Sequence, residues 1–376
     1  MKQQENAASF DPRMAAEGAA QQLAWSAIPA PPVQVLGLGF FERERAWNRL
    51  PQSLLPVLRD QRPAMVQLAA HTAGAALLFC TDSPEIWVRA ALCSPPYMSH
   101  MAPTAQCGFD CYVRGGHGER WQLAGVSKFE IGRARLCARL AQRLPGPVQV
   151  LVHLPLYVGV EQLELGLAPG ARLWAAPRPQ GPAAAFYGTS ITQGGCATRP
   201  GMAYPAILQR MLGTPMYNFG FSGNGVGLAC LAPVLCALPD LGLLVVDIEA
   251  NAGPEGLLPR NLPLFLDAVR ACRPRLPVLV LGGTLQAQEA WDPAFAQQRA
   301  GWASLQRSEV ERRRAAGDCA VWYADVRPFL NELEAEATVD GVHLTDLGFY
   351  CLAQGLAPLV RGLLGGEAPG HAVLQT

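Results

Sequence analysis

The pattern of apolar residues in the second half of the chain constrains its fold most strongly. From about residue 181 onward, short continuous apolar runs alternate with longer stretches in which apolar residues recur at helical spacing. Short continuous runs are typical of strands that helices cover on both faces, as in a parallel sheet. The runs are residues 183–187, 216–221, 241–248, 278–281 and 320–326, and the helical stretches are residues 203–213, 227–237, 259–272, 294–316 and 346–364. This alternation predicts an α/β domain with a doubly wound parallel sheet in flavodoxin-like order.

The preceding part of the chain follows a shorter period. Brief apolar or alternating runs are separated by Gly, Pro, Asp and Ser at residues 65–70, 75–80, 85–91, 108–113, 120–123, 148–152 and 163–167. Many short strands with turn signals between them predict a β-sandwich of jelly-roll type. The predicted organisation is a flexible arm at residues 1–32, a β-sandwich at 33–180, the α/β domain at 181–365 and a C-terminal tail at 366–376.

Charge and cysteine usage narrow the partners and the compartment. Lys+Arg and Asp+Glu both number 30, so the formal net charge is zero, and neither nucleic acid nor an acidic membrane surface is indicated as a partner. The eleven cysteines are scattered without a CxxC pair, which favours a reducing compartment. Residues 1–32 contain only short apolar pieces, so we expect no signal peptide or membrane span there and a cytoplasmic location.

No metal or cofactor is expected from the sequence. His71, His100, His117 and His153 lie at no spacing typical of a metal site, and each is predicted to be a turn or packing residue. No glycine-rich phosphate loop of the P-loop or dinucleotide type is apparent.

Tryptophans of the first domain are candidates for binding sugar, because aromatic faces stack on the apolar faces of sugar rings. They are Trp47, Trp87, Trp121 and Trp174. Core packing is favoured for Trp87, which alternates within a predicted strand, whereas Trp47 lies in a loop-like segment where both roles stay open.

Polar segments follow the first three predicted strands of the α/β domain and precede its last helix. The segments are residues 188–195 with Ser190, residues 218–225 with Gly223, residues 247–251 with Asn251, and residues 340–348 with Asp340 and His343. Because parallel strands end at one edge of the sheet, we expect all four segments to converge there.

The residue types in these segments suit acyl transfer. A serine hydroxyl becomes a nucleophile when a base takes its proton, and His343 can act as that base near neutral pH. Asp340 can accept the other imidazole N–H and fix the tautomer, as in a Ser-His-Asp triad. N–H donors of Ser190, Gly223 and the Asn251 side chain could then hold the negative oxygen that develops on the acyl carbon. Asn224 is an alternative source of the side-chain amide.

These motifs resemble the four sequence blocks of the SGNH hydrolases, also called the GDSL esterase/lipase superfamily. The resemblance implies that Ser190 is the nucleophile, that Gly223 and Asn251 belong to the oxyanion hole, and that Asp340 and His343 complete the triad. Residues 188–204 are similar to the branch in which a β-sandwich precedes the hydrolase domain, a branch that includes carbohydrate esterase-like proteins and an acyltransferase of natural-product biosynthesis.

Two positions depart from the superfamily pattern. Thr189 replaces the aspartate of the wider Gly-Asp-Ser block, but that aspartate is not a triad member. Asn251 follows Asp-Ile-Glu-Ala, where the wider family often has Gly-x-Asn-Asp.

Three neighbours of the nucleophile segment are further candidates for binding the substrate. Arg199 could hold a carboxylate or phosphate through its fork of donors. Cys196 and Tyr204 could line the acyl or alcohol pocket, and a structural role for both is an equal alternative.

The sequence therefore leaves three hypotheses for function. The first is a serine esterase that removes a small acyl group, such as acetyl, from a sugar or other hydroxylated small molecule. The second is an acyltransferase with the same acyl-enzyme, which takes its acyl group from a donor such as acyl-CoA or an acyl carrier and transfers it to a hydroxyl of a sugar or natural product. The third is a carbohydrate-binding protein with an inactive hydrolase domain, which the intact triad disfavours.

Overall fold

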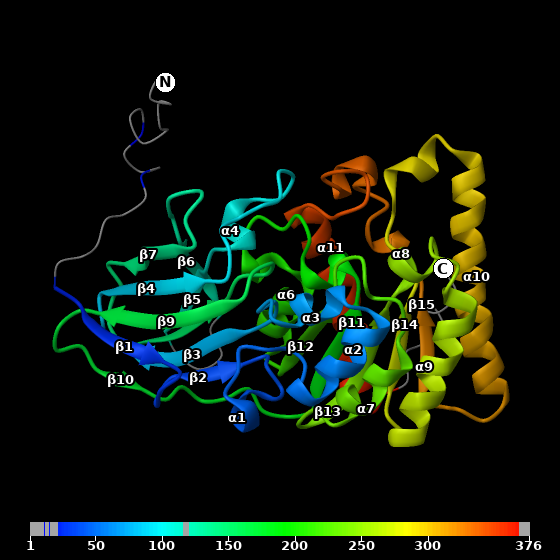
Figure 1. Cartoon of the computed structure of the whole chain (residues 1–376), viewed down its shortest axis with the longest axis horizontal. Helices are drawn as coiled ribbons and strands as arrows, with labels where there is room; N and C mark the ends of the chain where they lie inside the picture. The colour runs from blue at the N-terminus through cyan, green and yellow to red at the C-terminus, as the bar shows by residue number, and fades with distance from the viewer. Residues whose placement is uncertain (1–10, 12–14, 16–21, 116–119, 368–376) are drawn as a thin grey trace.

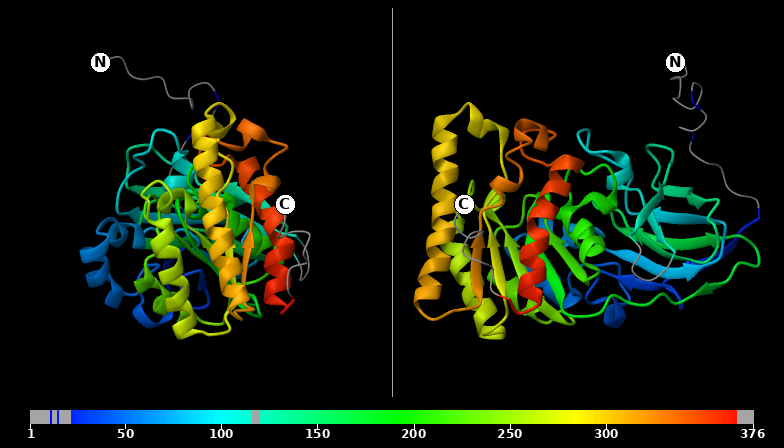
Figure 2. Two further views of the ribbon diagram at one scale, coloured as in Figure 1. Left: turned by 90° about the vertical axis from the view of Figure 1, so that its right-hand side faces the viewer. Right: turned by 180° about the vertical axis from the view of Figure 1, so that it is seen from behind.

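The computed structural model describes residues 22–115 and 120–367, together with residues 11 and 15. Most of the predicted arm, His117 and residues 368–376 of the predicted tail lie outside the described residues. Two antiparallel sheets at one end of the molecule adjoin a parallel sheet covered by helices at the other end (Figures 1 and 2). The chain therefore has the predicted β-sandwich followed by the predicted α/β layer structure.

The parallel sheet has the order β12-β11-β13-β14-β15, which confirms the flavodoxin-like arrangement. Its strands are β11 (Ala183–Gly188), β12 (Met216–Gly220), β13 (Leu241–Asp247), β14 (Val278–Leu281) and β15 (Val321–Ala324). Every pairing in this sheet is parallel, so all five strands end at the same edge.

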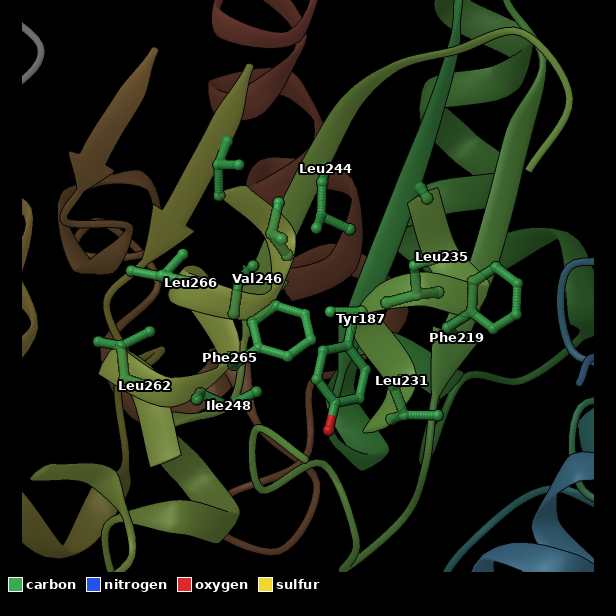
Figure 3. Close-up of a cluster of buried hydrophobic side chains, with 14 of the residues drawn as sticks. Tyr187, Phe219, Leu231, Leu235, Leu244, Val246, Ile248, Leu262, Phe265 and Leu266 are labelled. Atoms are coloured by element: carbon green, nitrogen blue, oxygen red, sulfur yellow. The ribbon is translucent and has the colours of Figure 1, made fainter. Parts of the chain in front are cut away.

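Successive residues of the central strands contribute to two separate cores, because strand side chains alternate between faces. Tyr187 and Val246 pack beneath α7 (Ala232–Cys236) and α9 (Leu258–Cys272), as the side chains in Figure 3 show, and α10 (Pro293–Ala315) contributes to the same core. Phe186 and Val245 pack on the opposite face. Burial on both faces explains why these strands are continuous apolar runs.

The helices on the opposite face are α6 (Tyr204–Leu212) and α11 (Asp346–Leu364), whose buried side chains share one core. Helix α11 is the one described helix that is long and apolar enough to cross a membrane by length and composition. Its buried residues include Phe349, Leu352 and Leu356, so it serves as a core helix in this fold.

The two remaining sheets form the predicted sandwich. One has the order β1-β9-β4-β7, and the other has the order β10-β3-β8-β5-β6 with β2 paired to β3. Phe79 and Val88 from the two sheets belong to one buried core. The strands are β1 (Ala24–Ile28), β2 (Gln34–Leu36), β3 (Ala76–Thr81), β4 (Glu85–Leu92), β5 (Asp110–Arg114), β6 (Gln122–Val126), β7 (Arg135–Gln142), β8 (Val148–His153), β9 (Val160–Leu167) and β10 (Leu173–Trp174).

Two predictions for the first domain are wrong. Residues 24–28, assigned to the flexible arm, form β1 and pair with β9. Residues 65–70, predicted as a strand, form α3 (Ala64–Ala69) after α2 (Leu55–Gln61). A short apolar run does not distinguish a strand from a buried helix, so the contacts of this segment decide its structure.

Helices α2 and α3 cover the α/β domain and not the sandwich. Leu58 and Met65 are completely buried in the same core as Phe219 of β12 and Leu235 of α7. The remaining short helices are α1 (Phe41–Glu44), α4 (Pro103–Gln106), α5 (Ser190–Gln193) and α8 (Glu249–Ala252).

Candidate active site

Ser190 is placed by the sharp passage from strand β11 into helix α5. The strand ends at Gly188, Thr189 caps the helix by accepting the Ile191 N–H at 3.3 Å, and Ser190 is the first helical residue. Its side chain is largely buried, so the hydroxyl is held at the carboxyl edge of the sheet in a restricted position.

His343 and Asp340 lie in the turn that precedes α11, next to Ser190. The distance from His343 Nε2 to Ser190 Oγ is 2.8 Å, and the distance from His343 Nδ1 to Asp340 Oδ2 is 2.7 Å. The other carboxylate oxygen accepts the backbone N–H groups of Val342 at 3.0 Å and His343 at 2.8 Å. Both oxygens of Asp340 are therefore fixed relative to the imidazole.

The surroundings of Asp340 favour its ionised form. Partial burial opposes ionisation, but hydrogen bonds from the backbone and ring of His343 outweigh it and hold the pKa of the carboxyl group below its usual value. An ionised Asp340 accepts the Nδ1–H of His343, which leaves Nε2 as the atom that can take a proton from Ser190.

The loop at residues 221–225 lies directly against the nucleophile segment. The Phe221 N–H donates to the Gly188 carbonyl at 2.9 Å, and a Cβ at Gly225 would approach that carbonyl oxygen to 2.2 Å. Only glycine permits this approach at residue 225. Gly223 has a φ of +66°, and within the described residues its N–H has no protein acceptor.

Asn251 is oriented toward this loop from helix α8. Its Oδ1 accepts the Gly225 N–H at 3.1 Å, which leaves its Nδ2 group as a donor with no protein acceptor in the described chain. By contrast, Asn224 uses both ends of its amide: Nδ2 donates to the Ser222 carbonyl at 2.7 Å and Oδ1 accepts from Arg62 Nε at 2.8 Å. The geometry favours Asn251 over Asn224 as the side-chain donor.

The first domain supports the loop through Gln193. The Gln193 Oε1 accepts the Ser222 N–H at 2.9 Å, while its Nε2 lies 2.9 Å from the Leu156 carbonyl and 3.1 Å from His71 Nδ1. Burial lowers the pKa of His71 to about 3, so its ring is neutral and Nδ1 can accept this hydrogen bond. His71 is therefore a packing and hydrogen-bonding residue.

Arg49 provides a second support from the first domain. Its buried guanidinium donates to the carbonyls of Gly220 and Leu68, and stacks 4.5 Å from the centroid of the Phe221 ring. Burial lowers the pKa of Arg49 to about 9, which still leaves a cation at neutral pH. Together with Gln193, it fixes both ends of the short passage from β12 into the loop.

Two of the weaker sequence candidates have structural roles. Tyr204 is completely buried, and its hydroxyl lies 3.1 Å from Thr192 Oγ1 and 3.5 Å from Asp247 Oδ2, so it cannot line a substrate pocket. Arg199 pairs with the buried Asp110 at 3.0 Å and hydrogen-bonds to the Tyr112 hydroxyl, which joins it to the sandwich.

Cys196 and His100, in contrast, adjoin the Ser190–His343 pair. The donor atoms of Cys196, His100, Asp340 and His343 all lie within 4.8 Å of one another, a grouping that could hold a metal ion. The ring centroids of His100 and His343 are 6.0 Å apart. Sequence reasoning assigned His100 to a turn or to packing, because spacing along the chain gives no sign that residues 100 and 343 meet.

A buried glutamine fixes the loop that carries His100. Gln106 Oε1 accepts the N–H groups of Tyr97 and Met98, both at 2.9 Å, and its Nε2 donates to the Met98 carbonyl at 2.9 Å and the Met101 carbonyl at 2.6 Å. The side chain thus satisfies four backbone groups of one loop. The sandwich thereby contributes an ordered wall to the site.

Two of the candidate tryptophans have packing contacts within the first domain. Trp87 is buried, as predicted, and its indole N–H donates to Glu85 at 2.6 Å. Trp47 packs against Phe41, with ring centroids 4.9 Å apart.

Comparisons with known proteins assign both halves of the chain. Residues 182–361 match the model of the GDSL-like lipase/acylhydrolase family, and residues 23–173 match the model for the N-terminus of SGNH hydrolase-type esterases. The chain is a member of the SGNH (GDSL) hydrolase superfamily. No curated protein sequence matches it.

Solved structures share this two-domain SGNH architecture. A GDSL-like lipase from Bacteroides ovatus is 26% identical, with a TM-score of 0.82, over 91% of this chain and 98% of the other. Salicylyl-acyltransferase SsfX3, from a tetracycline biosynthetic pathway, is 21% identical, with a TM-score of 0.74, over 92% and 99%. A family two carbohydrate esterase from Clostridium thermocellum, solved with cellohexaose, is 14% identical, with a TM-score of 0.55, over 78% and 93%. Membership in this superfamily makes the protein a hydrolase or an acyltransferase.

Proposed function

We propose that this SGNH hydrolase is a serine esterase that removes a small acyl group from a sugar or other hydroxylated small molecule. The observation that carries the proposal is the continuous hydrogen-bonded series from Ser190 Oγ through His343 to Asp340, with distances of 2.8 and 2.7 Å. Distances of this length permit direct proton transfer from the hydroxyl to the imidazole.

Acylation begins when His343 Nε2 takes the proton of Ser190 and the Oγ atom attacks the ester carbonyl carbon. The resulting negative oxygen receives hydrogen bonds from the N–H groups of Ser190 and Gly223 and from Asn251 Nδ2. His343 then returns the proton to the leaving oxygen, so that the C–O bond breaks and the alcohol departs. Asp340 holds the imidazole orientation and stabilises its charged form in both steps.

Deacylation repeats these steps with water in place of Ser190. His343 takes a proton from the water, the hydroxide oxygen attacks the acyl carbon, and the bond to Oγ breaks as the proton passes to Ser190. The carboxylic acid leaves and the enzyme returns to its starting state.

The loop that carries His100 supports a sugar-like substrate. Tyr97 lies three residues before His100 and leaves 59% of its surface exposed on the ordered loop. An exposed aromatic ring with a hydroxyl tip suits an alcohol that combines apolar ring faces with hydroxyl groups. A carbohydrate esterase of similar fold was solved in complex with cellohexaose, which is consistent with a carbohydrate substrate here.

An acyltransferase is the second candidate. It would form the same acyl-enzyme from a donor such as acyl-CoA or an acyl carrier, and a hydroxyl of the acceptor would replace water. The fold shared with salicylyl-acyltransferase SsfX3 is compatible with this outcome. Exclusion of water by a bound acceptor would determine which reaction dominates.

The test is hydrolysis of p-nitrophenyl acetate and longer-chain esters, combined with mass spectrometry of the intact protein during turnover. We expect Ser190→Ala to lower kcat by roughly 10⁴-fold or more and to abolish the acyl adduct. Ser308→Ala, on the exposed face of α10, is the matched control and should retain both.

Different results would redirect the proposal. An acyl adduct or full activity in Ser190→Ala would exclude Ser190 as the nucleophile. Faster loss of the adduct on addition of sugar acceptors, with an acylated sugar as product, would favour the transferase.

A further inference from the structure

A second group of side chains surrounds His343 besides those that the esterase mechanism uses. His100 comes from the sandwich, Cys196 from the segment after α5, and Asp340 and His343 from the turn before α11. Their donor atoms, two imidazole nitrogens, a sulfur and a carboxylate oxygen, all lie within 4.8 Å of one another.

This donor set matches the preference of a zinc ion. Zn²⁺ takes four ligands from His, Cys and Asp in tetrahedral geometry, with Zn–N and Zn–S bonds of about 2.0 and 2.3 Å, so that ligand atoms lie roughly 3.3–3.8 Å apart. The group must contract by about 1 Å to reach this geometry. His100 is exposed, so its ring can rotate toward the other three ligands.

The backbone of Cys196 supplies an independent observation. Its φ is +69°, in the left-handed region that disfavours residues with a side chain. The other described non-glycine residues with positive φ are Arg45, Arg143 and Asp240, and all three are exposed. Cys196 alone is buried, and within the described residues its Sγ has no hydrogen-bond partner.

A glycine at residue 196 would adopt this φ without strain. The chain instead has a cysteine there, although within the described part of the chain its thiol makes no hydrogen bond or disulfide that would stabilise the fold. Strained backbone of this kind is concentrated at functional sites. The Cys196 thiol also interacts electrostatically with the Asp340 carboxylate, so the thiol faces the turn that carries Asp340 and His343.

We propose that His100, Cys196, Asp340 and His343 form a binding site for Zn²⁺, and that the bound ion reversibly inhibits the enzyme. The inhibition rests on the proposed function, because the ion occupies the base and its carboxylate partner. A neutral imidazole has one nitrogen with a free lone pair, so zinc bound at either ring nitrogen of His343 leaves Nε2 unable to take the proton of Ser190. Zinc binding also displaces the thiol proton of Cys196 into solvent, since the thiolate is the ligand.

The first experiment is a zinc titration of ester hydrolysis. Each protein is compared with its own activity after treatment with a chelator, so that altered basal rates do not enter the result. We expect the half-inhibitory zinc concentration to rise at least tenfold in Cys196→Ser and in His100→Ala. Cys319→Ser removes an exposed thiol just before β15, at the amino ends of the parallel strands and opposite the edge that carries Ser190, and should match the wild type. Equal inhibition of all four proteins would overturn the proposal.

The second experiment measures binding without catalysis. Co²⁺ is added to Ser190→Ala, which retains all four ligands but lacks the nucleophile, and the absorption of the cobalt–thiolate bond is recorded. We expect a band that disappears in the double variant with Cys196→Ser and persists in the double variant with Cys319→Ser. A band that is absent, or that is independent of Cys196, would overturn the metal site.

These measurements separate the two proposals. A Cys196-dependent cobalt band in Ser190→Ala, together with a wild-type protein that hydrolyses no ester and forms no acyl adduct, would sustain the metal site and refute the esterase. Esterase activity without that band would do the reverse.

Discussion

At the scale of single residues, the sharpest distinction is between Asn251 and Asn224. Asn251 Oδ1 accepts the Gly225 N–H, and its Nδ2 remains available as a donor. In Asn224, Nδ2 donates to the Ser222 carbonyl and Oδ1 accepts from Arg62. A donor that contacts only the transition state contributes to kcat and little to KM. In the proposed mechanism, Asn251 Nδ2 is the side-chain donor that would act in this way.

Asn251→Ala should therefore lower kcat by about 10²–10³-fold with little change in KM, as expected for loss of one oxyanion donor. Asn224→Ala is the matched control and should lower kcat less than tenfold, since it removes support from the loop without removing a donor. Steady-state kinetics on p-nitrophenyl acetate measure both. A larger loss in Asn224→Ala would transfer the donor role to that residue.

The sequence alone predicted that Ser190, His343 and Asp340 lie close together, because each lies in a segment bounded by recognisable strands or helices. It was insufficient for His100. That residue reaches the site from a loop whose course depends on the buried amide of Gln106 and on the packing of the sandwich against the α/β domain. Contacts between domains leave no period or spacing in a sequence.

At the scale of elements, strand β13 ends in a carboxylate that joins it to α5 and α6. Asp247 Oδ2 accepts from Thr192 Oγ1 at 2.8 Å and lies 3.5 Å from the Tyr204 hydroxyl. Burial outweighs these bonds and raises the pKa of Asp247 to about 6, with a further contribution from Glu249. At neutral pH Asp247 is therefore mostly ionised in the folded protein, although its carboxylate is more stable in the solvated, unfolded chain.

The sign of the resulting pH dependence follows from linkage. Because the folded pKa is above the unfolded value of about 4, protonated Asp247 favours the folded state, and this contribution is lost as pH rises through about 6. Asp247→Asn cannot ionise and can still accept the two hydroxyl hydrogen bonds. Its unfolding free energy relative to the wild type should rise between pH 4 and pH 7 by up to ~3 kcal/mol, because the pKa of Asp247 is about 6 in the folded protein and about 4 in the unfolded chain.

Urea denaturation of both proteins across this pH range measures the difference. A difference that does not change with pH would show that Asp247 titrates alike in the folded and unfolded states.

The elements also show where sequence patterns stop being informative. The α/β strands were predicted to within a few residues, because burial on both faces gives unmistakable apolar runs. Residues 65–70 were assigned to a strand, but six residues are too few to reveal a helical period. What makes them a helix is their burial with α2 against β12, which no local signal records.

At the scale of the whole molecule, the sandwich and the hydrolase are one structural unit. The segment with Leu58 and Met65 belongs to the first half of the sequence and completes the core of the second half. A buried polar contact adds to this joint, where Asp110 binds His153 at 2.8 Å and Arg199 at 3.0 Å. A buried carboxylate left without these partners would cost several kcal/mol. The predicted boundary at residue 181 therefore marks a point along the chain, but residues from both sides of it share a buried core.

Calorimetry tests this interdependence. We expect one heat-absorption transition for the full chain, with the van't Hoff and calorimetric enthalpies equal, because residues of the first half complete the core of the second half. Leu58→Ala at the joint and Leu163→Ala within the sandwich each remove a buried side chain and should cost ~2–5 kcal/mol. Both variants should move the same transition to lower temperature. Two transitions, of which Leu163→Ala moves only one, would show that the halves fold separately. A fragment of residues 181–376 with native near-ultraviolet circular dichroism would establish the same point directly.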